Sequence, residues 1–225
     1  MPTFTTTFTP PTAPSGFELA ADLDLSAVVM TWDASAIAQV DFAGFRVYRS
    51  LDGGLTFDLL QILPLVSDVT YSDFEAPLNA DLVYRLTQSN LDFESDPVDG
   101  SIMLASSQWH IVVPGDADLT FGIPKLRAAS LTSPKVDDVF SPLGRPGKMV
   151  IGDTVQTEDG EISFIAMPGN LGMVALLKAI QSRMEGGIIL KATDGSVWPV
   201  QFQSMRRTFT SWAGQEISIP FVGVD

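Results

Sequence analysis

Residues 44–57 read GFRVYRSLDGGLTF. The first six of these residues alternate between two kinds of side chain, as a half-buried β-strand does. Asp52 and the two glycines after it predict a tight turn, because Asp accepts backbone hydrogen bonds and Gly tolerates positive φ. Phe57 is then expected to return the chain to the core. The stretch therefore predicts a β-hairpin.

The turn of this hairpin also matches the Asp-box pattern, Ser-x-Asp-x-Gly-x-Thr-aromatic. Its members are Ser50, Asp52, Gly54, Thr56 and Phe57. In sialidase-like propellers the box recurs once in every blade. Here there is one copy, so the pattern indicates a structural turn and not a glycosidase.

Similar strand-like runs lie on both sides of the hairpin, at 27–32, 57–62 and 82–89. Clusters of Asp, Gly, Asn and Pro separate them at the spacing typical of a β-sandwich. No stretch between residues 15 and 105 has helical period. This half of the chain is therefore expected to be all-β.

The order of these features resembles a fibronectin type III domain. The resemblance runs through Pro11, Pro14, Trp32, residues 44–49, 71–73, 84–90 and 95–97. It implies a sandwich with Trp32 at its centre and Phe45 beside it. The expected sandwich core is Trp32, Phe45, Val47, Tyr84 and Leu86. The family's corner tyrosine falls at Leu82 here, and a leucine cannot make the corner hydrogen bond.

The second half combines strand-like runs with one amphipathic helix. The strands are expected at 109–113, 148–151, 161–166, 187–191, 197–203 and 217–222. The helix is expected at about 171–184, where apolar side chains recur on one face: Leu171, Val174, Leu177, Ile180 and Met184. Asn170 is its candidate N-cap, and Gly186 is its candidate C-terminal stop.

This order of elements resembles the β-barrel-plus-helix domain of tailed-phage tail-tube, distal-tail and minor tail proteins. The matching parts are a strand ending at Gly152, residues 158–166, the single helix, residues 187–190, 194–200 and the hairpin 209–222. The expected fold class is thus all-β with one helix. A fibronectin type III-like β-sandwich comes first, and a tail-type β-barrel with a single amphipathic α-helix follows.

Charge supports this division. Residues 1–14 are expected to form a Thr/Pro-rich extended arm, 15–105 the sandwich and 106–225 the assembly domain. Residues 1–105 hold 15 acidic side chains and three arginines, a net charge of −12. The remaining residues hold 12 acidic and ten basic side chains, including all five lysines. The net charge of −14 over 225 residues therefore belongs mostly to the first half.

Composition excludes several functions. Such an acidic chain gains nothing from counterion release on nucleic acid and is repelled by anionic membranes. With no Cys and only His110, it has no Cys or paired-His metal site and one candidate imidazole base. We therefore expect no catalytic, cofactor-binding or metal residues. The sequence shows no secretory signal and no membrane span, which predicts synthesis in a host cytoplasm.

Close acidic pairs, such as Asp22 with Asp24 and Asp116 with Asp118, are expected by chance among 27 acidic residues. None of them completes a glycosidase pair or an EF-hand ligand series. Calcium binding at one of these loops stays open.

Candidate interface residues lie in two places. Phe4 and Phe8 belong to the N-terminal arm, which is either a flexible leader or an arm on a neighbouring subunit. The second place is a basic and aromatic stretch that either grips a neighbour or forms a hairpin with its aromatic rings inside. Its members are Trp198, Arg206, Arg207 and Trp212.

Together these features predict a non-enzymatic structural protein of a phage tail, either a minor tail or a distal-tail (baseplate) protein of the virion. The C-terminal domain is expected to form a trimeric or hexameric ring with copies of itself and with other tail proteins. The sandwich is expected to project outward as a spacer or a weak host-surface adhesin that contacts glycans. The alternative is a carbohydrate- or cell-surface-binding module without catalytic activity.

Overall fold

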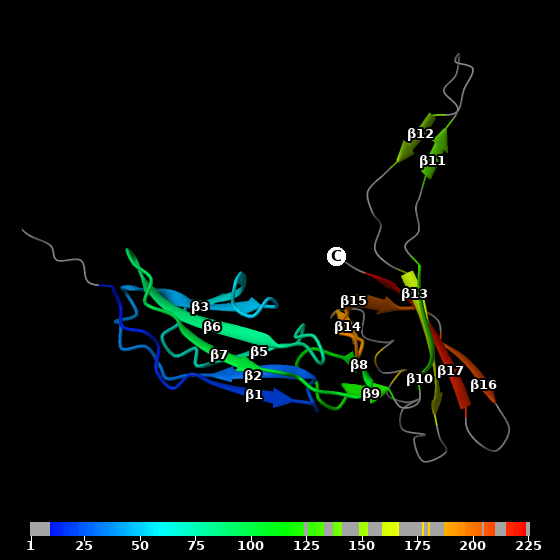
Figure 1. Cartoon of the computed structure of the whole chain (residues 1–225), viewed down its shortest axis with the longest axis horizontal. Helices are drawn as coiled ribbons and strands as arrows, with labels where there is room; N and C mark the ends of the chain where they lie inside the picture. Colours follow the sequence, from blue (N-terminus) through cyan, green and yellow to red (C-terminus); the bar gives the residue numbers. More distant parts are fainter. Residues whose placement is uncertain are drawn as a thin grey trace, which may run out of the picture. The chain divides into compact units, whose positions relative to one another are not determined.

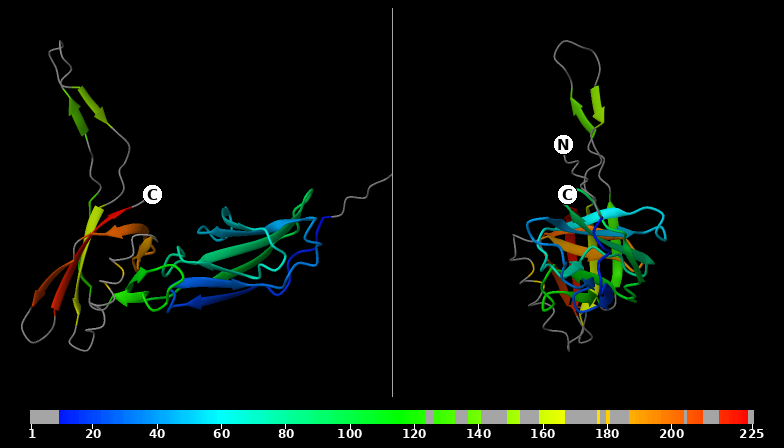
Figure 2. Two further views of the ribbon diagram at one scale, coloured as in Figure 1. Left: turned by 180° about the vertical axis from the view of Figure 1, so that it is seen from behind. Right: turned by 90° about the vertical axis from the view of Figure 1, so that its left-hand side faces the viewer.

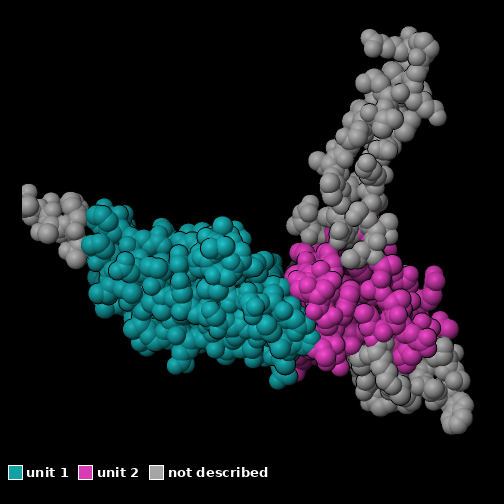
Figure 3. All heavy atoms as spheres, in the orientation of Figure 1, with its two compact units in different colours: residues 1–106 teal, residues 107–225 magenta. Residues whose placement is uncertain are grey.

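A computed structural model describes residues 10–123, 126–132, 137–140, 149–152, 159–166, 177, 180, 187–203, 205–209 and 215–223. The chain divides into two compact units, which we call unit 1 (Met1–Ser106) and unit 2 (Ser107–Asp225) (Figure 3). Among the described residues, no helix has the length and apolar character needed to cross a membrane.

Unit 1 is a sandwich of two antiparallel sheets (Figure 1). The three-stranded sheet has the order β1 (Glu18–Asp22), β2 (Ala27–Thr31), β5 (Thr70–Asp73). The four-stranded sheet has the order β4 (Asp58–Leu63), β3 (Phe42–Ser50), β6 (Leu82–Asn90), β7 (Val98–Ile102). This two-layer architecture is the one that fibronectin type III domains adopt. Unit 1 is thus a fibronectin type III-like β-sandwich.

The core between these sheets contains all five side chains expected there from the sequence, Trp32, Phe45, Val47, Tyr84 and Leu86. The rings of Trp32 and Phe45 lie 5.5 Å apart in a tilted arrangement. Leu82 is fully buried in the same cluster, so an apolar contact occupies the position of the family's corner tyrosine. Period-two alternation directs Phe45 and Val47 inward from β3 and Leu82, Tyr84 and Leu86 inward from β6, and Trp32 directly follows β2.

Two β-bulges lie along β3, one in its pairing with β6 and one in its pairing with β4. The first, between Phe42 and Gly44, leaves Gly44 at φ +139°, a conformation that other residues rarely adopt. The second makes Leu60 an extra residue, because Val47 pairs with Gln61 and Tyr48 pairs with Leu59. The hairpin itself is present as predicted, joining β3 to β4.

Unit 2 contains an eight-stranded antiparallel sheet. Along its main path the order is β10-β13-β17-β15-β14-β8-β9, and β16 pairs with β17. The bounds are β8 (Trp109–Val112), β9 (Phe121–Ile123), β10 (Leu126–Thr132), β13 (Asp159–Ala166), β14 (Ile188–Lys191), β15 (Val197–Phe202), β16 (Arg206–Phe209) and β17 (Gln215–Gly223). A separate ladder pairs β11 (Asp137–Phe140) with β12 (Met149–Gly152), as Figure 2 shows.

One apolar cluster covers a face of this sheet. It takes Ile123 from β9 at one end of the strand order and Phe164 from β13 near the other. Leu177 and Ile180 join it, and these two described residues of the expected helix are helical and buried. The rest of the expected helix lies outside the described residues. Among the residues that are described, the ladder from β10 to β9 stays open, and no pairing closes it into a barrel.

Candidate binding surface

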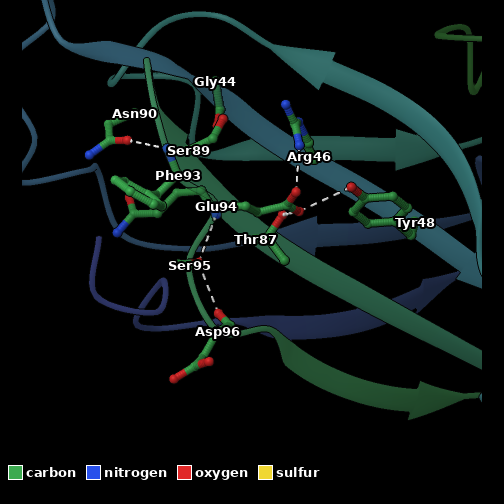
Figure 4. Close-up of polar contacts among 11 residues, drawn as sticks. Gly44, Arg46, Tyr48, Thr87, Ser89, Asn90, Phe93, Glu94, Ser95 and Asp96 are labelled. Carbon is green, nitrogen blue, oxygen red and sulfur yellow. Dashed lines mark hydrogen bonds and ion pairs between the residues drawn. The ribbon is translucent and has the colours of Figure 1, made fainter. Parts of the chain in front are cut away.

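The loop between β6 and β7 is held in one conformation by hydrogen bonds from its own residues (Figure 4). The Asn90 side-chain oxygen accepts from the backbone N–H groups of Asp92, at 3.0 Å, and Phe93, at 2.7 Å. Ser95 pairs with Gln88 twice, once through its N–H and once through its hydroxyl. Asn at the end of a strand often forms such an Asx turn. The backbone of the loop is therefore fixed.

Glu94 fastens this loop to the outer face of the four-stranded sheet (Figure 4). Its carboxylate accepts hydrogen bonds from Arg46 Nη1 at 2.5 Å, the Tyr48 hydroxyl at 3.0 Å and Thr87 Oγ1 at 2.5 Å. Burial raises the pKa of Glu94, but the hydrogen bonds from Thr87 and Tyr48 and the charge of Arg46 outweigh it, so the pKa lies below its ordinary value. Strands β3 and β6 both contribute to this latch.

The latched loop presents apolar and acidic side chains together. Leu91 is 72% exposed and Phe93 38% exposed. Because Phe42 pairs with Asn90, the chain just before β3 leaves the sheet at the same end, and there Val40 is 80% exposed. We call this surface the tip patch, and its exposed members are Val40, Asp41, Leu91, Asp92, Phe93 and Asp96. Exposed apolar groups on a rigid loop are typical of binding surfaces.

A second polar group lies between the two sheets. Asp73 Oδ2 accepts hydrogen bonds from Arg49 Nη1 and the Tyr84 hydroxyl, both at 2.8 Å, and its Oδ1 accepts from Glu75 N–H. Burial raises the pKa of Tyr84, and the neighbouring Asp73 charge raises it further. Burial lowers the pKa of Arg49, but Asp73 more than compensates. This buried clasp is structural, since solvent does not reach the Asp73 carboxylate.

The Asp-box turn forms around Asp52 in an exposed hairpin. Asp52 accepts hydrogen bonds from the Ser50 hydroxyl, the Thr56 hydroxyl and two backbone N–H groups, and Ser50 Oγ accepts from Gly54 N–H. Bonds from Ser50 and then Thr56 hold the pKa of Asp52 far below its ordinary value. All of these donors come from the turn itself. The Asp52 carboxylate therefore organises the turn.

Phe57 differs from its prediction. It is half-buried, and its ring lies 3.9 Å from the guanidinium carbon of Arg85 instead of in the core cluster. Arg85 in turn makes two 2.8 Å hydrogen bonds to Asp99. Arg85 and the outward residues of β3 share the outer sheet face because Arg85 pairs with Tyr48. The Asp-box turn thus packs on the outer face of the sheet through a cation–π contact.

The predicted interface residues of unit 2 are distributed as follows. Trp198 is half-buried, packs on the unit 2 core and stacks on Trp109 with ring centroids 5.9 Å apart. Arg206 and Arg207 are exposed on β16, which in the described part of the chain pairs along one side only, with β17. Among the described residues, Trp198 makes no hydrogen bond or ring contact with these arginines. Phe4, Phe8 and Trp212 lie outside the described residues.

The single histidine is buried in unit 2. His110 pairs across the ladder with Lys191, which is fully buried. Burial, and then the charge of Lys191, lowers the pKa of His110 to about 4. Within the described ranges, no three His, Asp or Glu side chains are placed to hold a metal ion.

Comparison with known proteins gives fold neighbours only. No protein-family model matches the sequence, and no curated protein matches it. An Fn3-like protein from Clostridium thermocellum aligns with 44% of this chain and 97% of its own, at 16% identity and a TM-score of 0.36. The structure of titin kinase and its flanking domains aligns with 96% of this chain at 10% identity and a TM-score of 0.34. The aligned part is 38% of the length of the titin chain.

Proposed function

We propose that this chain is a non-enzymatic structural protein of a tailed phage, a minor tail or distal-tail (baseplate) component of the virion. In this proposal unit 2 assembles with copies of itself and with other tail proteins. Unit 1 projects as a spacer or weak host-surface adhesin. The resemblance of the sequence to tail domains supports the assignment. The main structural support for it is the set of unpaired strand edges in the described part of unit 2.

Unit 2 has strand edges that suit self-assembly. In the described part of the chain, β9, β10 and β16 each pair along one side, which leaves backbone groups ready to pair with another chain. The β11–β12 ladder is a two-stranded sheet apart from the larger one. An isolated two-stranded ladder is marginally stable in water, so this one favours a covering partner.

The proposal extends to a barrel in unit 2. Side chains from β9 and from β13 belong to one cluster although these strands lie far apart in the sheet order. Neighbouring strands lie about 4.8 Å apart, so in a flat sheet strands this far apart in the order are separated by tens of ångströms. This supports a curved sheet of the tail-tube type.

The charge of unit 1 supports a projecting role. Its three arginines are all ion-paired, to Glu94, Asp73 and Asp99. The unit has no Lys or His to neutralise its other carboxylates. Two such negatively charged surfaces repel each other, which keeps neighbouring copies of unit 1 separate and soluble.

The second candidate is a carbohydrate- or cell-surface-binding module without catalysis. The latched loop with exposed Phe93 favours it, because a rigid aromatic side chain is a common contact for ligands. In this case the isolated chain is a monomer and binds glycans. Binding to an array of host cell-wall glycans tests this second property directly.

One experiment on the β11–β12 ladder distinguishes the tail protein from the binding module. Thr132 pairs directly with Asp159, so an Asn-Gly turn in place of residues 133–158 closes the β10–β13 hairpin without strain. We expect the full chain to be a trimer or hexamer by light scattering and this variant to assemble less. A full chain that is monomeric at every concentration contradicts the tail proposal.

A further inference from the structure

We propose that the tip patch of unit 1 binds strand β16 of a second copy of this chain, through the exposed Arg206 and Arg207. The contact rests on the proposed function, since it gives the assembling copies a specific interface. The contact is heterologous, because it joins two different surfaces of the chain. Repeated copies therefore form a closed ring when the rotation from one copy to the next divides a full turn.

The tip patch has the chemistry of a site for a cationic segment. Asp41, Asp92 and Asp96 are exposed there, beside the exposed side chains of Leu91 and Phe93. Among the described residues, no hydrogen bond uses the carboxylates of Asp92 and Asp96, because Asn90, Glu94 and Ser95 hold the loop instead. The acidic groups therefore stay available in a fixed geometry.

Unit 1 cannot satisfy these carboxylates with its own cations. Arg46, Arg49 and Arg85 are its only basic side chains, and each already pairs with a carboxylate at 2.5–2.8 Å. The complementary charge must come from another surface. Ten of the 13 basic side chains of the protein lie in unit 2.

Among the described residues of unit 2, strand β16 carries a pair of adjacent basic side chains, and it fits this surface. Its two adjacent arginines are exposed, and the strand lies on the edge beside β17. Successive residues of a strand point to opposite faces, so Arg206 and Arg207 reach to both sides of the edge. Arginine forms strong paired hydrogen bonds with carboxylates, and it also stacks on aromatic rings such as Phe93.

The rigidity of the loop favours this contact energetically. Glu94 and Asn90 hold the tip patch before any partner arrives, so its association loses little loop entropy. The attraction between acidic and basic surfaces also accelerates encounter and weakens with salt. The assembly is therefore expected to lose mass as the salt concentration rises.

Charge reversal in the full chain tests the contact. Light scattering is expected to show an oligomer for the wild-type chain. The variants R206E/R207E and D92K/D96K are both expected to have a lower mass because they assemble less. Each pair is expected to raise the concentration for half-assembly at least about tenfold, the effect of roughly one lost ion-pair interaction. The four-substitution variant carrying both pairs restores the opposite charges and is expected to regain the wild-type mass.

The matched control is D58K/D81K, which changes the charge of unit 1 by the same amount at two exposed carboxylates outside the tip patch. It is expected to keep the wild-type mass, and circular dichroism checks that every variant stays folded. If the wild type is oligomeric but neither charge reversal lowers its mass, or the combined variant stays dissociated, the contact is wrong while the assembly role stands. A monomeric wild type overturns both.

Discussion

Arg49 on β3 donates a 2.8 Å hydrogen bond to Asp73 on β5, and this ion pair joins the two sheets of unit 1. Asp73 is 2% exposed, and the Tyr84 hydroxyl donates to the same oxygen. A buried pair of this kind depends on both partners, because removal of one leaves an uncompensated charge. The clasp therefore contributes to holding the sandwich together.

The first prediction concerns this clasp. Asp73→Ala leaves Arg49 without its buried partner and is expected to lower the free energy of unfolding of unit 1 by about 3–5 kcal/mol. Asp99→Ala removes an exposed ion pair with Arg85 and is expected to lower it by about 1 kcal/mol or less. Urea unfolding of both full-length variants, followed by the fluorescence of the chain's four tryptophans, measures the difference. Equal losses contradict a structural role for the buried clasp.

The sequence predicts one half of the clasp and misses the other. Alternation on residues 82–86 places Tyr84 in the core, as found. Nothing local shows that Arg49 and Asp73, 24 residues apart, meet between the sheets. The same holds for Glu94: Thr87 lies seven residues before it, but Arg46 and Tyr48 lie 48 and 46 residues away on β3. Pairing between distant strands creates these sites, and a single sequence does not encode their register locally.

The second prediction concerns the Glu94 latch. The folded pKa of Glu94 lies below its ordinary value of 4.5. Its contribution to stability is therefore complete above the unfolded pKa and is lost as the pH falls through the folded pKa. Glu94→Gln is expected to lower the free energy of unfolding of unit 1 by about 1 kcal/mol at pH 7. Unfolding curves of both proteins from pH 7 to pH 3 are expected to converge in acid, and a constant difference rejects the latch.

The third prediction compares two glycines of the same hairpin. A Cβ at Gly44 lies 2.9 Å from Ile62 Cγ2 and 3.1 Å from the Leu63 carbonyl oxygen, and its φ is +139°. Gly44→Ala is therefore expected to destabilise unit 1 by about 1–3 kcal/mol or more through strain and crowding. Gly53→Ala meets nothing within 4 Å and adds only the strain of φ +73°, about 1 kcal/mol. Thermal unfolding ranks the two, and the opposite order rejects the bulge geometry.

The fourth prediction uses the single histidine. Because His110 is the chain's one imidazole, its proton NMR signal is unambiguous. We expect a titration midpoint near 4, where burial and the Lys191 charge set the pKa. The folded pKa lies below the ordinary 6.5, so unit 2 loses about 3 kcal/mol of stability as the pH falls from 6.5 to 4. A midpoint near 6.5 contradicts the buried position.

The sequence predicts unit 1 more fully than unit 2. Alternation and Gly-rich turns define the sandwich strands, and five of its seven strands, β2 to β6, overlap the motifs read from the sequence. In unit 2 the sequence patterns do not predict β9, β10 and β11, whereas the expected hairpin 209–222 begins at the end of β16. The run RAAS in β10 has neither strong alternation nor β-branched side chains, so only its pairing with β13 reveals it.

The mass of the full chain in solution tests the central claim most directly. The monomer has a mass of 24.2 kDa. Sedimentation equilibrium over a range of protein concentrations is expected to give a trimer or hexamer that weakens as salt is added. A mass of one chain at every concentration and at low salt contradicts a protein built to assemble.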